Sequence, residues 1–338
     1  MSLKHYMKKN TIFIFIFLSL FFTGELFGEI IQDSTGKFIT LNSPVKKIVV
    51  LTSDALEIVR AIKAEESVIG VYFEVSKKPL FWQDLKNRTK VGSWREVNYE
   101  LIAKLKPDIV ICYTDYPGRT LEKKLNPFGI KIIRLNFYKL NTIEKEIKTL
   151  GHILEREQDA EKLIVWYREN LNFIQEKLKT VESRPSVYIE GYLNYNTAGK
   201  NSGGNEMCLL AGGNNIASNI LVPYPKITSE WVLSNNPDII IKAVGKNSRT
   251  SADDLSSLKQ LSKKIQSRIL WDNIEAVHNN KVFLISNEIW TGSRTLIGLS
   301  YMAKWFYPKL FKDFDPEKLH KEYFEKFQGI KFYGTYVY

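Results

Sequence analysis

Histidine, which binds metals and moves protons near neutral pH, is sparse in this sequence. The 338 residues include four histidines, and these are His5, His152, His278 and His320. A bare zinc or manganese ion needs several imidazole and carboxylate ligands together, whereas these histidines are spread along the chain. We therefore predict no metal site built by the protein and no intrinsic cofactor, so any metal would arrive already chelated.

Motifs of known catalytic sites are missing as well. The sequence contains no GxSxG elbow, HExxH helix, phosphate-binding P-loop or GxGxxG turn. Ser293, in the segment Thr291-Gly-Ser-Arg294, can be considered as a nucleophile, but no histidine is paired with it in a recognisable pattern. We predict a loop serine that contacts ligand or backbone, no catalytic residue and no enzymatic activity. A secreted α/β hydrolase that uses Ser293 is the alternative.

Two segments share a spacing that places an acid ahead of an apolar run. Glu100 and Glu230 are each followed by six residues, then by Pro-Asp and three apolar residues. Each acid falls in the first turn of a predicted short helix, for which Asn98 and either Thr228 or Ser229 are available as caps. An acid is favoured there by the helix dipole, but the dipole does not explain the repeated spacing. We interpret the two parts of the chain as quasi-equivalent.

The elements around these acids indicate an α/β fold. Apolar, β-branched runs alternate with helical stretches, which predicts a largely parallel sheet in each half of the chain. The predicted strands of the first half are Lys47–Leu51, Val68–Val71, Asp108–Cys112 and Lys131–Leu135. Those of the second half are Ser186–Ile189, Asp238–Ile241 and Lys281–Ile285.

A long helical pattern separates the two halves. From Thr142 to about Val181 the apolar residues recur at helical spacing, and Arg184-Pro185 ends the pattern. We predict a signal peptide at residues 1–28, an N-terminal α/β lobe at 29–155, a linking helix at 156–183 and a C-terminal α/β lobe at 184–338. With one helix as the main connection, the lobes would form a clamp of limited bending.

The first residues are typical of a secretory signal peptide. Three lysines precede the apolar run from Thr11 to Phe22, and the small residues Gly24 and Gly28 follow it. The run is shorter than the roughly 20 residues that cross a bilayer as a helix, although a permanent anchor is the alternative. No cysteine follows it as a lipoprotein would require. We predict cleavage near Gly28 and a soluble periplasmic protein.

The formal net charge is +11, and the basic residues alternate with acids along predicted helices. Mixed faces of this kind are usually solvated, so we predict no nucleic-acid partner, and an anionic ligand or general solubility as the reason for the basic charge. Cys112 and Cys208 fall in different predicted lobes and are expected to be buried free thiols.

Three segments resemble the periplasmic binding proteins for ferric siderophores, haem and cobalamin. They are Val91–Glu100, Leu105–Ile111 and Val222–Glu230. The resemblance covers nearly all of the chain after the signal peptide. It implies two Rossmann-like α/β lobes bridged by one long α-helix, with the ligand in the cleft between them. It also implies that Glu100 and Glu230 dock on arginines of a membrane permease.

The resemblance further implies a set of ligand contacts. Aromatic positions of the cobalamin-binding members correspond to Trp94, Tyr113 and Tyr224. Flat aromatic faces suit large, partly apolar chelates, and a nearby arginine would meet carboxylate or catecholate oxygens. The full candidate set is Trp94, Arg95, Tyr113, Tyr116, Tyr224, Trp290 and Arg294.

We therefore expect a monomeric, periplasmic, solute-binding component of an ABC importer. Its ligand would be a metal chelate, either a ferric siderophore or other iron complex or a corrinoid, and its partners a permease dimer with a cytoplasmic ATPase. Haem and a molybdate or tungstate oxyanion remain open as ligands. An exported sensory module that signals through a partner is a further alternative.

Overall fold

The computed structural model describes residues 29–42, 44–93, 95–245 and 255–338. The predicted signal peptide, residues 1–28, and the candidate ligand residue Trp94 lie outside the described residues. Within the described part of the chain, no helix combines the length and the apolar character needed to cross a membrane.

The first lobe is built on a parallel sheet of five strands in the order β5-β4-β3-β6-β7. Its strands are β3 (Ile48–Val50), β4 (Val68–Val71), β5 (Thr89–Lys90), β6 (Ile109–Cys112) and β7 (Lys131–Arg134). An antiparallel hairpin of β1 (Glu29–Gln32) and β2 (Phe38–Leu41) precedes it. The helices of this lobe are α1 (Ser53–Ala61), α2 (Tyr99–Leu105) and α3 (Thr120–Leu125).

The second lobe has a parallel sheet of four strands in the order β11-β10-β8-β9. Its strands are β8 (Ser186–Glu190), β9 (Asn214–Asn215), β10 (Ile239–Val244) and β11 (Val282–Ser286). The helices are α6 (Gly203–Leu210), α7 (Ser229–Asn235), α8 (Leu255–Gln266), α9 (Glu275–His278), α10 (Asn287–Trp290), α11 (Thr295–Phe306) and α12 (Pro316–Glu322).

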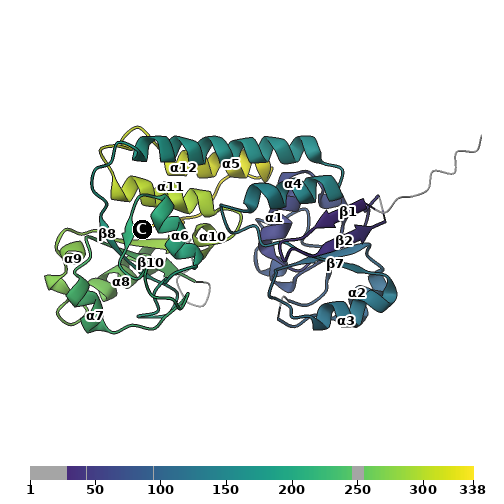
Figure 1. Cartoon of the computed structure of the whole chain (residues 1–338), viewed down its shortest axis with the longest axis horizontal. Coiled ribbons are helices and arrows are strands. Elements are labelled where there is room, and N and C mark those ends of the chain that lie inside the picture. The colour runs from purple at the N-terminus through teal and green to yellow at the C-terminus, as the bar shows by residue number, and fades with distance from the viewer. Residues whose placement is uncertain (1–28, 43, 94, 246–254) are drawn as a thin grey trace, which may run out of the picture.

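The first lobe ends with α4 (Ile143–Ile153), and the longer α5 (Glu157–Leu178) then connects the two lobes. The chain turns between these helices at Glu155, whose φ is +54°. A side chain at Gly151 would place its Cβ 2.4 Å from the Cβ of Ala160, so the close approach of the two helices requires glycine. Figure 1 shows α5 lying along one side of the molecule and spanning both lobes. The predicted fold, two α/β lobes bridged by one long helix, is confirmed.

The hydrophobic core runs from one lobe to the other. One continuous cluster joins residues of α1, α4 and α5 to residues of α6, α11 and α12, while smaller clusters fill the outer face of each sheet. At its centre, the Trp166 ring lies 5.5 Å from those of Tyr323 and Phe327. The lobes are therefore joined by a shared apolar layer as well as by α5.

Candidate functional site

A cavity of about 300 Å³ lies between the two lobes. In α/β folds, ligands bind beyond the carboxyl ends of the parallel strands, and this cavity has that position in both lobes. Its walls come from segments that follow β3, β4 and β6 in the first lobe and β8 and β11 in the second. The lining residues are Ser53, Asp54, Glu57, Tyr72, Lys78, Phe81, Trp82, Tyr113, Tyr192, Asn287, Glu288, Thr291, Ser293 and Arg294.

Asp54 brings a buried carboxylate to this cavity from the first turn of α1. Thr52 caps that helix, since its hydroxyl accepts from the backbone N–H of Ala55 at 3.3 Å. The Asp54 carboxylate is 9% exposed and accepts hydrogen bonds from the Tyr113 hydroxyl at 2.8 Å and the Ser53 hydroxyl at 3.0 Å. Burial raises the pKa of Asp54 to about 6, against the lowering effect of the Tyr113 hydrogen bond, and the charge of Glu57 adds to the rise.

Arg294, a candidate ligand residue from the second lobe, is buried and forms ion pairs within its own lobe and with the first lobe. Its guanidinium lies 3.2 Å from Glu57 of the first lobe and 3.2 Å from Glu288 of the second. Burial alone lowers the pKa of Arg294, but the charge of Glu57 raises it above its ordinary value. A second interlobe pair joins Lys78 to Glu288. The floor of the cavity is thus a network of charges shared by both lobes.

Tyrosines from both lobes surround the cavity and its mouth. The rings of Tyr113 and Tyr138, from the first lobe, are 6.1 Å apart and meet edge to face. Burial, together with the nearby phenol of Tyr224 from the second lobe, raises the pKa of Tyr138 to about 12. Burial and Tyr224 also raise the pKa of Tyr192. Tyr192, Tyr224 and the first-lobe candidate Tyr116 each have about half of their surface exposed.

A buried arginine holds the first-lobe loop that carries two of these tyrosines. Arg134, at the end of β7, pairs with Glu122 at 2.9 Å. Its guanidinium also donates to the backbone carbonyls of Tyr113 at 2.8 Å and Pro117 at 2.9 Å. A buried cation is costly unless its N–H groups are hydrogen-bonded, so the loop carbonyls that accept from Arg134 are held in place. The loop that contains both Tyr113 and Tyr116 is thereby fixed.

An equivalent network holds the second-lobe loop. Glu190, at the end of β8, is 1% exposed and pairs with Lys242 at 2.9 Å and Arg268 at 2.7 Å. It also accepts from the backbone N–H of Tyr195 at 3.1 Å, while Lys242 donates to the carbonyl of Gly191 at 2.7 Å. The loop between Glu190 and Tyr195 carries Tyr192, so each lobe uses buried charges to position tyrosines of the cleft.

The remaining candidate ligand residues lie apart from the cavity wall. Trp290 is 7% exposed and packs on α6, where a Cβ at Gly204 would lie 2.4 Å from its ring. Arg95 is exposed, and its backbone N–H donates to the Ser93 hydroxyl at 3.2 Å. The structure therefore brings Tyr113 and Arg294 to the cavity wall and places Trp290 in the core.

Ser293 is buried in the interlobe network. The residue is 2% exposed, its hydroxyl donates to Glu57 at 2.8 Å, and its carbonyl accepts from the Tyr167 hydroxyl of α5. His320 is also buried there, but it contacts Arg294. The serine hydroxyl is thus hydrogen-bonded to a carboxylate that already pairs with Arg294, which ties the loop before α11 to α1.

Glu100 and Glu230 occupy matching positions in the two lobes. Both are exposed and both fall in the first turn of a short helix. The side chain of Asn98 caps α2 by accepting from Leu101 at 3.0 Å, and that of Thr228 caps α7 by accepting from Trp231 at 3.2 Å. Figure 1 places α2 and α7 toward the two outer ends, on the side of the molecule opposite α5.

The Pro-Asp pairs of the two segments also have equivalent roles. The Asp108 carboxylate accepts from the backbone N–H groups of Lys46 and Lys47, both at 2.8 Å. Asp238 accepts from the backbone N–H and the hydroxyl of Ser186, both at 2.7 Å. Each aspartate thereby ties the start of its own strand to the segment that begins the neighbouring strand, as expected for quasi-equivalent lobes.

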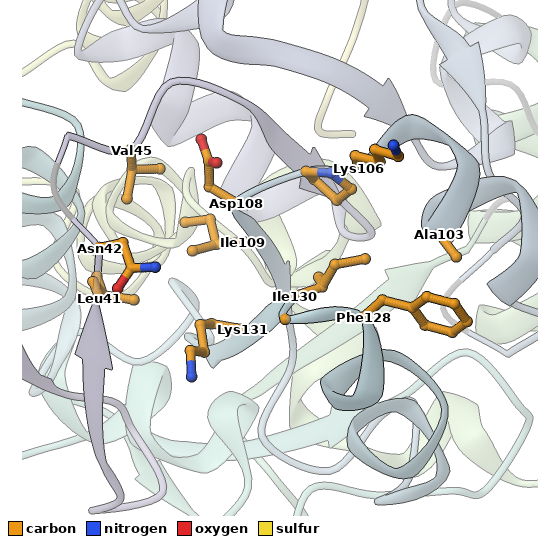
Figure 2. Close-up of a pocket in the computed structure, with 12 residues that line it drawn as sticks. Leu41, Asn42, Val45, Ala103, Lys106, Asp108, Ile109, Phe128, Ile130 and Lys131 are labelled. Atoms are coloured by element: carbon orange, nitrogen blue, oxygen red, sulfur yellow. The ribbon is translucent and has the colours of Figure 1, made fainter.

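A separate cavity of about 430 Å³ lies at the opposite edge of the first sheet (Figure 2), where β6 and β7 begin. Figure 2 shows Ile109 and Ile130 between Val45 and Phe128 in this view. A further hollow of about 630 Å³ adjoins it beside Glu100 and shares Phe128, which is 67% exposed. None of the cleft tyrosines lines either hollow.

The described residues contain no group of three or more His, Cys, Asp or Glu side chains arranged to hold a metal ion. Both cysteines, Cys112 and Cys208, are buried and free, as predicted. Of the charged residues that line the cavity, Arg294 was a candidate, whereas Asp54, Glu57, Lys78 and Glu288 were not expected from the sequence. The available signal was position, because Asp54 and Glu288 closely follow the ends of β3 and β11.

Two α/β lobes, a bridging helix and a cavity at the strand ends define a two-lobed binding protein of the type that holds its ligand between the lobes. Residues 48–289 match the family described as "Periplasmic binding protein". Since this match covers most of the 338 residues, the chain belongs to that family, and it is a periplasmic binding protein of the ABC-importer type.

Three similar proteins illustrate the family. The "Uncharacterized ABC transporter substrate-binding lipoprotein YvrC" of Bacillus subtilis is 27% identical over 298 residues, covering 86% of this chain and 88% of the relative. The "Molybdate-binding protein MolA" of Haemophilus influenzae is 23% identical over 354 residues, covering 95% and 97%. The TroA-like periplasmic binding protein FepB from Veillonella parvula superposes with a TM-score of 0.77 at 22% identity, covering 91% of this chain and 99% of that one, which supports the fold.

Proposed function

We propose that this binding protein captures a metal chelate, such as a ferric siderophore, another iron complex or a corrinoid, and delivers it to an ABC permease. The observation that carries the proposal is the set of tyrosines contributed by both lobes, with Tyr113 and Tyr138 on one side and Tyr192 and Tyr224 on the other. A ligand that touches both sides favours the approach of the lobes, because its contacts are complete only when they are close.

Tyrosine suits a chelate because it combines a flat apolar face with one polar atom. The organic shell of a chelate packs on the ring faces, while the phenols hydrogen-bond to its oxygens or amides. The cavity of about 300 Å³ would take a compact part of the ligand, and the exposed rings of Tyr192 and Tyr224 would cover the rest. The metal would be supplied by the ligand and held by the chelator.

Delivery would depend on Glu100 and Glu230. Both are exposed at the starts of matching helices, so they present two carboxylates of equal local geometry to a dimeric permease. The backbone N–H of Glu230 and the Thr228 hydroxyl hold the pKa of the Glu230 carboxyl below its ordinary value, which keeps it charged near neutral pH. We propose that a monomer docks with one lobe on each permease subunit, and that the ATPase of the importer supplies the energy.

An oxyanion is the second candidate, because the similar protein MolA is named for molybdate binding. A dianion in a small site needs donors that are not already satisfied by carboxylates. In this cavity Asp54, Glu57 and Glu288 face the two cations Lys78 and Arg294. The excess of acids favours the chelate over the oxyanion.

A hydrolase and a sensory module are the alternatives to a transport protein, and each makes a different experimental prediction. For a hydrolase, Ser293 would have to act as nucleophile, but its hydroxyl is buried and donates to Glu57. Turnover of model esters that is lost in Ser293→Ala would support a hydrolase. For a sensory module, loss of docking at Glu100 and Glu230 would leave the signalling output intact.

The binding test uses the purified mature protein and its tryptophan emission. Trp82 lines the cavity and is 1% exposed, so a coloured chelate bound there should quench it. We expect saturable, sub-micromolar quenching by one chelate among ferric siderophores, cobinamide, cobalamin and haem, weakened at least tenfold by Tyr224→Ala. A response to molybdate alone would replace the chelate by the oxyanion, and silence with every ligand would contradict the proposal.

The docking test combines Glu100→Ala with Glu230→Ala. Because both acids lie outside the cavity, the double variant should bind its ligand with unchanged affinity and lose most of its importer-dependent uptake. A matched control is Glu275→Ala, which removes an exposed acid from the first turn of α9. Full uptake by the double variant would refute the docking role.

A further inference from the structure

The charged groups that face the interlobe cavity have an unequal balance. The carboxylates of Asp54, Glu57 and Glu288 line it together with the cations of Lys78 and Arg294, so the described wall has more acids than bases. Glu57 and Glu288 form salt bridges with these cations. Asp54 has neither of the two cations at salt-bridge distance. Its hydrogen bonds come from the neutral hydroxyls of Ser53 and Tyr113.

Both cations are already engaged by carboxylates. Arg294 is held at 3.2 Å by Glu57 and at 3.2 Å by Glu288, and Lys78 pairs with Glu288 across the cleft. An anionic ligand would have to displace one of these carboxylates from its cation and leave its negative charge uncompensated in the cavity wall, which is unfavourable. The Arg294–Glu57 and Lys78–Glu288 pairs also join the two lobes, so their disruption would loosen the cavity itself.

The rim adds hydroxyls that stay uncharged. Burial raises the pKa of the Tyr113 and Tyr192 phenols, and that of Tyr138 to about 12, so all three remain neutral near pH 7. Neutral phenols accept from a ligand's amide or ammonium groups and donate to its oxygens. The overall charge of +11 acts mainly in solvent, where salt screens it over about 10 Å.

We infer that the complex captured in this cavity has no net negative charge, and that it presents hydrogen-bond donors or a cationic group to Asp54. This inference rests on the proposed function, since it specifies the chelate of that same site. Neutral and monocationic tris-hydroxamate complexes of iron belong to this class, as do cationic corrinoids. Anionic tris-catecholate complexes and oxyanions fall outside it.

The test compares the binding of four probes of different charge to the intact mature protein. They are a monocationic ferric tris-hydroxamate, a cationic aquo-corrinoid, a trianionic ferric tris-catecholate and molybdate, each titrated against tryptophan emission at fixed ionic strength. We expect saturable binding of at least one of the first two, at least a hundredfold tighter than either anion. Tighter binding of the tris-catecholate would overturn this inference and leave the chelate receptor intact. Silence with all four would overturn the proposed function, and the inference with it.

Two variants test the charges themselves. Asp54→Asn should weaken binding of the cationic probe at least tenfold and improve that of the anionic probes, while Glu288→Gln should shift affinity in the same direction. Asp272→Asn replaces an exposed aspartate away from the cavity and is the matched control. It should change neither the affinity for the cationic probe nor that for the anionic probes. If Asp54→Asn weakens the cationic and anionic probes equally, the carboxylate has a structural role and the inference is wrong.

Discussion

Replacement of Asp54 by asparagine should make the protein more stable at neutral pH while it weakens the binding site. The native protein keeps the Asp54 proton up to about pH 6, whereas the unfolded chain releases it near the ordinary value of 3.8. Between these values the native state binds more protons, so the free energy of unfolding falls as the pH rises. The stabilising effect of the protonated form is complete below about pH 4 and is lost as the pH passes through 6.

The size of the effect follows from the two pKa values. Each tenfold change in proton affinity is worth about 1.4 kcal/mol, so a rise from 3.8 to about 6 lowers the free energy of unfolding by about 3 kcal/mol above pH 7. Asparagine has nearly the same shape, keeps an acceptor for the Tyr113 hydroxyl and cannot ionise. Relative to the native protein, the variant should therefore gain about 3 kcal/mol between pH 4 and pH 8.

Urea denaturation of both proteins at pH 4, 5, 6, 7 and 8 measures this gain, provided that the slope of the unfolding free energy with urea stays the same. Comparison of the two pH profiles removes any constant effect of the amide. Asp272→Asn, an exposed control, should follow the native profile. Parallel profiles for Asp54→Asn and the native protein would show that Asp54 ionises normally in the folded state, and would refute the reasoning.

Three further predictions concern stability and reactivity. Glu57→Ala leaves Arg294 buried beside a single acid, and should lower the free energy of unfolding by about 3 to 5 kcal/mol in urea, whereas a loss below about 1 kcal/mol would contradict the importance of the pair. Asp238→Ala removes two hydrogen bonds to Ser186 and should cost about 1 to 3 kcal/mol by the same measurement; an unchanged midpoint would show that water replaces them. Burial raises the pKa of both thiols, that of Cys112 to about 12, so a thiol reagent should label the protein only in denaturant, and rapid labelling of the native protein would contradict their burial.

The fold was largely predictable because its strands are apolar and its breaks are strong. The central strands β3, β6 and β10 are buried on both faces, so they read as continuous runs of Val and Ile in the sequence. The two-residue strands β5 and β9 were missed, since Thr-Lys and Asn-Asn give no periodic signal. The conformation of a long element with a consistent apolar pattern can be predicted from its own residues. Whether a two-residue segment pairs at the edge of a sheet depends on the strands beside it.

The site was only partly predictable, for a physical reason that Arg294 and Asp54 illustrate. An arginine in a loop near aromatic residues is a reasonable ligand contact, but the sequence does not show that Glu57, far away along the chain, will neutralise it. Asp54 was not singled out in the sequence, because its burial depends on Tyr113 and Gly292, which are brought beside it by the fold. Charge compensation across lobes is a tertiary property, so residue types alone do not reveal it.

The same interlobe charges connect the rigidity of the protein with its selectivity. Glu57 and Arg294 join the lobes directly beneath the cavity, and Tyr167 of α5 binds the carbonyl of Ser293 beside them. Opening the cleft widely would separate a buried ion pair, so the lobes are restricted to small movements about this floor. Binding energy must then come from a surface that exists before the ligand arrives, which is what Arg134 and Glu190 provide by fixing the tyrosine loops. A cleft preformed in this way discriminates by the charge and shape of its ligand, since it cannot rearrange around one that does not match.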